Sequence, residues 1–75
     1  MVEVKEVEAG FQVSGAHFNE VFHSRFKATM AAYAVALGDA TEAGHAVAIT
    51  LPGGWGDPIL IEPGPGAATP GPQHA

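Results

Sequence analysis

Apolar and polar residues alternate in two short stretches near the start of the chain. Residues 2–6 show this alternation, and residues 11–14 repeat it after a break at Gly10. A period of two is typical of a strand with one buried face. Glycine adopts positive φ at little steric cost, which suits a turn between strands. We therefore expect these two stretches to pair as a β-hairpin.

The next apolar stretch, residues 18–26, fits two different periods. At period two it predicts a third strand, and at period 3.6 it predicts an early start of the following helix. We favour the strand because Ser24 is a good N-cap residue for a helix beginning after it. Arg25 and Lys27 would then lie in the first turn, where the helix dipole prefers acidic side chains. A helix start near Asn19 therefore stays open.

Residues 25–43 predict a helix on either interpretation, because the segment is rich in alanine. Several larger apolar residues fall on one face, the usual pattern of a core-facing stripe. They are Phe26, Met30, Tyr33 and Leu37, with Ala34 beside them. Gly38 weakens the helix, and Asp39 with Glu42 has the spacing of a capping box, so a break there is open. Gly44 suits the position after the helix end.

The remaining apolar stretches predict two more strands. Residues 45–51 alternate, and residues 59–61 are a short apolar run; a glycine-rich turn at 52–58 separates them. The expected element order is β-β-β-α-β-β. This order indicates an α+β fold in which an antiparallel β-sheet carries one helix on one face.

The C-terminal stretch differs from the rest in composition. From Pro63 onward, thirteen residues include four prolines and three glycines. Proline removes backbone donors and glycine raises the entropy cost of ordering, so neither a helix nor a strand ladder is expected. We predict a single small domain at 1–62 and a flexible, disordered Pro/Gly-rich tail at 63–75.

Composition and charge narrow the class of protein. Eight acidic residues against three basic ones give a net charge of −5, which disfavours binding to phosphates. There is no cysteine for disulfides or thiolate ligands, and no apolar run long enough to span a membrane. Residues 1–6 lack the basic and apolar regions of a signal peptide. We expect a cytoplasmic protein, and its negative charge disfavours nucleic acid as a partner.

No catalytic, cofactor or metal site is predicted. The serines lie outside a nucleophile-elbow motif, and the histidines show no metal-binding spacing. Ser24 and His23 are adjacent in an extended segment, so their side chains point to opposite faces. A metal site built from His17, His23 and Glu20 is the alternative. We expect a protein that is not an enzyme.

A domain of this size is expected to gain stability from a partner. About sixty residues bury only about 60% of the surface that the unfolded chain exposes. Disulfides and metals are not expected here, which leaves oligomerisation, most simply as a two-fold dimer. One helix covers one sheet face, and the opposite face is expected to hold mainly small or uncharged residues. They are Val7, Gln12, Ser14, Val21, His23, Ala46, Ala48, Thr50 and Leu60.

Trp55 is the most distinctive residue of the glycine-rich turn. No helix is expected after it, so the turn does not fit a phosphate-binding loop. Trp55 either presents its ring to a partner, as tryptophan does at binding hot spots, or folds back and closes the core. We favour the second interpretation. The candidate interaction residues are thus Val21, His23, Ala46, Ala48, Trp55 and Leu60.

The predicted function is self-association or docking to another protein, without catalysis. The alternatives are an accessory domain that associates with nucleic acid and a small-ligand binder that uses Trp55.

The order of these motifs resembles a known type of protein. Residues 10–13, the Ser24 cap before Ala28 and Ala32, and the turn at Trp55 look like small stand-alone bacterial proteins of unknown function. Those proteins have a strand hairpin, one helix and a second hairpin. The resemblance covers residues 2–62 and implies this fold, but no activity or cofactor.

Overall fold

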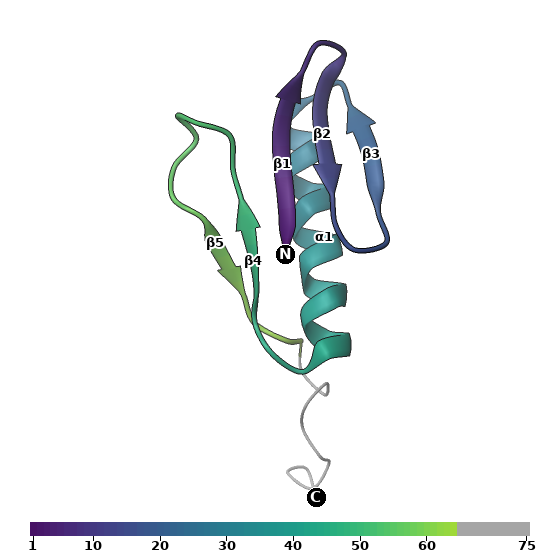
Figure 1. Cartoon of the computed structure of the whole chain (residues 1–75), viewed down its shortest axis with the longest axis vertical. Coiled ribbons are helices and arrows are strands. Elements are labelled where there is room, and N and C mark those ends of the chain that lie inside the picture. The colour runs from purple at the N-terminus through teal and green to yellow at the C-terminus, as the bar shows by residue number, and fades with distance from the viewer. Residues whose placement is uncertain (65–75) are drawn as a thin grey trace, which may run out of the picture.

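In the part of the chain that the structure describes, five strands form one sheet and a single helix lies against it (Figure 1). The computed structural model of the chain describes residues 1–64. In chain order the elements are β1 (Val2–Val7), β2 (Gly10–Ser14), β3 (Asn19–Phe22), α1 (Arg25–Ala43), β4 (Val47–Thr50) and β5 (Ile59–Ile61). The predicted α+β class is confirmed. The predicted tail lies outside the described residues from position 65 onward.

The first three strands form an antiparallel meander, as the alternating pattern predicts. β1 pairs with β2, and β2 pairs with β3. Gly10 has a φ of 148°, and a Cβ at this position would collide with the carbonyl oxygen of Phe22 on β3. Only glycine therefore lets the two backbones approach so closely.

The prediction of a fully antiparallel sheet is wrong, because the sheet is mixed. The strand order is β3-β2-β1-β4-β5, and β1 and β4 run parallel through the pairs Val2 with Ile49 and Glu3 with Thr50. β3 runs in the same direction as β1, since each is antiparallel to β2. The helix carries the chain back along the sheet, so β4 starts in that same direction. When β4 docks beside β1, the two strands form the parallel pair of the sheet.

Both helix ends lie where the capping residues predict them. Ser24 is the N-cap, and its Oγ accepts a hydrogen bond of 3.2 Å from the backbone N–H of Lys27. Gly44 ends the helix in the left-handed conformation, with φ of 80°. Residues 19–22 are a strand, so the early helix start is wrong. The possible break at Gly38 does not occur, because α1 is continuous to residue 43.

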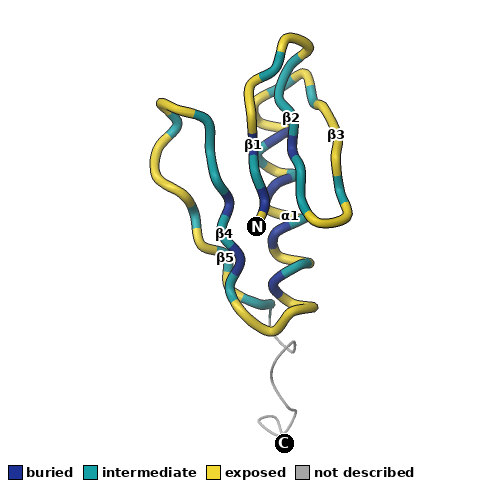
Figure 2. The backbone as a smooth tube through the Cα atoms, in the orientation of Figure 1, coloured by how far each residue is buried: buried dark blue, intermediate teal, exposed yellow. Residues whose placement is uncertain are grey.

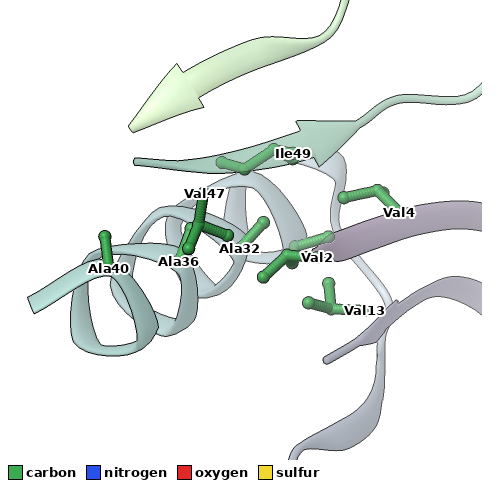
Figure 3. Close-up of a cluster of buried hydrophobic side chains, with 9 residues drawn as sticks. Val2, Val4, Val13, Ala32, Ala36, Ala40, Val47 and Ile49 are labelled. Atoms are coloured by element: carbon green, nitrogen blue, oxygen red, sulfur yellow. The ribbon is translucent and has the colours of Figure 1, made fainter. Parts of the chain in front are cut away.

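The face that α1 turns to the sheet consists of alanines. Ala28, Ala32, Ala36 and Ala40 are at most 1% exposed and belong to one core cluster with the valines and Ile49 of β1, β2 and β4. Figure 2 shows buried positions at intervals along α1, and Figure 3 shows Ala32, Ala36 and Ala40 beside the side chains of the sheet. The prediction that the larger apolar stripe faces the core is therefore wrong. Alanine at every fourth position lets the helix lie close to a sheet whose own side chains fill the space between.

Candidate interaction surface

The large apolar side chains of α1 lie on the outside of the molecule. Phe26 is 71% exposed, Met30 54%, Tyr33 41% and Leu37 44%. At 3.6 residues per turn, this stripe is rotated by about 110° from the alanine stripe. The helix therefore has two neighbouring apolar stripes, and the sheet covers only the one with small side chains.

A groove runs between this outer stripe and the edge strand β5. Its volume is about 460 Å³, and it is lined by Met30, Tyr33, Ala34 and Leu37 from the helix and by residues 60–62 from the strand. Leu60 is 62% exposed, but it pairs with Ala48, so its side chain points to the open face of the sheet. We call Phe26, Met30, Tyr33, Ala34 and Leu37, together with the adjoining β5 segment 60–62, the α1–β5 surface.

The apolar area of this surface follows from the exposed fractions of its side chains. Aromatic side chains bury roughly 150–250 Å² each, and we take about 200 Å² for each large side chain of the stripe. The exposed fractions of the four large residues of α1 then give on the order of 400 Å² of mostly apolar area. That lies within the range of about 300–600 Å² of the largest apolar patch on a typical monomer, which is often functional.

The backbone edge of β5 contributes little to this surface. The strand has three residues and lies between Pro58 and Pro63. A short edge strand next to prolines is poorly suited to adding a further strand, because proline has no N–H to donate. Contacts at the α1–β5 surface are therefore side-chain contacts for the most part.

The residues predicted for a sheet-face interface do not form one patch. Val21 lies on β3 opposite Gln12, and Ala48 lies on β4 opposite Leu60. Between them run β1 and β2, whose open face carries Lys5 and Gln12. The polar strands thus separate Val21 and His23, which follows β3, from Ala46, Ala48 and Leu60. Of the predicted set, Leu60 alone lines the groove.

Trp55 is half-buried at the end of the core. Its ring lies 5.6 Å from that of Phe11, and the Arg25 guanidinium sits over it at 4.1 Å. The ring packs against the core cluster, which agrees with the prediction that Trp55 folds back and closes the core. One face of the indole is thereby occupied by a residue of the same chain.

The charged and histidine side chains of the described chain form no cluster that could hold a metal ion. His17 and His45 line a second hollow of about 270 Å³ together with Asp39 and Glu42. Even so, among residues 1–64 no three His, Asp or Glu side chains come close enough to hold a metal ion. Within the same residues, no helix has the length and apolar character needed to cross a bilayer.

Sequence reasoning missed Met30, Tyr33 and Leu37 as surface residues. The sequence does contain a pattern that identifies the buried face, namely alanine at 28, 32, 36 and 40. Hydrophobicity alone favours the larger side chains for the core, and that preference hides the alanine stripe.

Comparisons with protein-family models, with curated proteins and with solved structures gave no match. The resemblance to small bacterial proteins stays a prediction from residues 2–62 of the sequence. The function is therefore argued from the α1–β5 surface itself.

Proposed function

We propose that this protein is a non-catalytic domain that self-associates through the α1–β5 surface. The observation that carries the proposal is the row of large apolar side chains along α1, each more than 40% exposed. Covering them removes apolar area from water, which is the main favourable term in protein association.

The exposed apolar area of this surface is close to the apolar area that one protomer buries in a dimer of standard size. A stable interface of standard size buries about 800 Å² on each side, of which about 65% is apolar in homodimers. That corresponds to on the order of 500 Å² of apolar area per protomer. The four large side chains of α1 supply on the order of 400 Å², which is most of this amount.

The chemistry of the groove supports binding rather than catalysis. Most of its lining is aliphatic, and its polar side chains are those of Tyr33 and Glu62. General acid–base work needs a positioned proton donor or acceptor whose pKa is tuned near the working pH. A mostly aliphatic groove that is open to solvent instead suits side-chain packing.

Sedimentation equilibrium of the whole chain tests the proposal. The monomer mass is 7.7 kDa, and we expect the dimer mass, which is twice this value, at micromolar concentrations. Leu37→Gln should shift the equilibrium toward monomer, because it places an amide within the area that the dimer buries.

Val21→Gln is the matched control. Val21 is 43% exposed against 44% for Leu37, but it lies on the open sheet face. This control should leave the dimer intact. A wild-type chain that stays monomeric at millimolar concentration, or a dimer that Val21→Gln breaks and Leu37→Gln does not, would contradict the proposal.

A further inference from the structure

The described chain ends in contact with the helix at one end of the α1–β5 surface. The backbone N–H of Gly64 donates a hydrogen bond of 2.9 Å to Oγ1 of Thr41, and a Cβ on Gly64 would lie 3.6 Å from Cδ1 of Leu37. Thr41 lies one turn after Leu37 on the same face of α1. The residues that follow, 65–75, therefore start at the C-terminal end of this surface. We call them the C-terminal segment.

The C-terminal segment matches the surface in chemistry. It contains three prolines and three alanines, and no Asp, Glu, Lys or Arg. Proline-rich segments bind grooves lined by aromatic side chains, because the polyproline II conformation presents side chains without needing a strand ladder. The stripe on α1 offers the exposed rings of Phe26 and Tyr33. An uncharged, proline-rich segment thus starts beside an apolar groove that contains aromatic side chains.

We propose that the C-terminal segment folds back along the α1–β5 surface of its own protomer and competes there with the second copy. This inference rests on the proposed self-association, whose strength the segment regulates. Two copies then bind each other only when both surfaces are free of their own segment.

The local sequence suits a reversal of the chain directly after Gly64. Proline favours the first central position of a type II β-turn and glycine the second, and Pro65-Gly66 has this order. Such a turn brings its first and fourth residues, Gly64 and Ala67, within about 7 Å of each other. Ala67 would then begin the return path close to the end of the groove, about level with the helix turn between residues 37 and 41.

The return path places two prolines along the groove. A polyproline II segment advances by about 3.1 Å per residue and a helix by about 1.5 Å. Pro70 therefore lies about level with Tyr33, and Pro72 about level with Met30. Both helix residues line the groove. The segment is thus long enough to cover the groove with proline rings.

A short connection makes even a weak contact effective. A segment joined to its site by a few residues has an effective concentration in the millimolar range, about a thousand times a micromolar concentration of second copies. Each protomer binds its partner only during the fraction of time for which its surface is free. If that fraction is about one third, the product for two protomers is about one ninth. The segment then raises the dissociation constant of the dimer about tenfold.

Removal of the two proline rings tests the competition. The double variant P70G/P72G keeps the net charge, and its dimer should be about tenfold tighter than the wild-type dimer in sedimentation equilibrium. Q73G/A75G is the matched control, because it adds two glycines to the same segment without removing a proline. The control dimer should be as strong as the wild type. A P70G/P72G dimer that is no tighter than the control dimer would overturn the competition.

A spin label reports the position of the segment within one protomer. The chain has no cysteine, so Gln73→Cys gives a single attachment site, which the return path places about level with Phe26. At concentrations where sedimentation shows only monomer, the label should broaden the amide signals of residues 26–30. Broadening confined to residues 40–44 and 60–64, near the point where the segment starts, would overturn the fold-back.

The two measurements distinguish this inference from the proposed function. A chain that never dimerises, with or without the prolines, overturns the self-association and with it the competition. A wild-type dimer that P70G/P72G does not strengthen overturns the role of the segment and leaves self-association standing. A tighter P70G/P72G dimer, together with broadening at residues 26–30, supports the regulation.

Discussion

The rotation of α1 about its own axis can be tested by exchanging sizes at two adjacent positions. Ala36 is fully buried against the sheet, while Leu37 is 44% exposed on the outer stripe. Ala36→Leu adds three carbon atoms to a layer that has no room for them. Leu37→Ala removes a side chain that is about half in contact with the rest of the protomer.

The expected magnitudes differ in a way that can be measured. Overpacking a core position costs about 1–3 kcal/mol, and a site against a rigid sheet lies toward the upper end. Full burial of a leucine side chain contributes about 1.5–3 kcal/mol, so a half-buried one contributes about 1 kcal/mol. Alanine is slightly the better helix former, which lowers that loss further. We expect Ala36→Leu to destabilise the protomer about twice as much as Leu37→Ala.

Urea unfolding gives the free energies directly. Trp55 is the single tryptophan of the chain and packs on Phe11, so its fluorescence reports loss of the core. Measurements at concentrations where sedimentation shows only monomer keep association out of the result. A larger loss for Leu37→Ala than for Ala36→Leu would mean that the outer stripe faces the sheet, and would refute the orientation of the helix.

Three further predictions concern local structure and are checked by the same unfolding measurements. Gly10→Ala should lower the free energy of unfolding by about 1–3 kcal/mol, because Gly10 has positive φ and a Cβ there collides with Phe22. Gly38→Ala should raise it by about 1 kcal/mol, because nothing lies within 4 Å of the added Cβ and alanine is the better helix former. Equal effects of the two substitutions would contradict this. Ser24→Ala should cost about 1 kcal/mol through the lost cap, and an unchanged stability would show that the cap is dispensable. Arg25→Gln should cost about 0.5–1 kcal/mol and alter the Trp55 emission, since the cation over the ring is removed; an unchanged spectrum would speak against that contact.

Local features of the fold were predictable from the sequence because their causes are local. Ser24 and Gly44 mark the helix ends through hydrogen bonding and backbone conformation of a few neighbouring residues. The alternation in β1 and β2 reflects burial of one face, which needs no knowledge of the rest of the chain. The continuity of α1 through Gly38 follows from the burial of Ala36 and Ala40 on either side, which outweighs a cost of about 1 kcal/mol.

The strand order depends on contacts that are distant in the sequence. β4 docks beside β1 rather than beside β3, and only two residue pairs join it there. No turn or spacing in the sequence encodes that choice, because it depends on which sheet edge the helix leaves accessible. The mixed sheet could therefore not be predicted from element order alone.

The position of the large exposed side chains was not predictable for a related reason. The sequence predicts exposed apolar area on the open face of the sheet, whereas four of the large exposed side chains lie on α1. α1 has two apolar stripes, and the choice between them depends on the distance between helix and sheet. Valines fill the sheet side, so the stripe with the smallest side chains, Ala28 to Ala40, fits against it. The large side chains are thereby left outside.

Backbone amide chemical shifts, recorded over a dilution series of the wild-type chain, test most directly which surface joins two copies. The shifts that change with concentration should belong to residues 30–37 of α1 and 60–62 of β5. Changes centred instead on Gln12, Val21 and the open face of the sheet, or no change up to millimolar concentration, would contradict association through the α1–β5 surface.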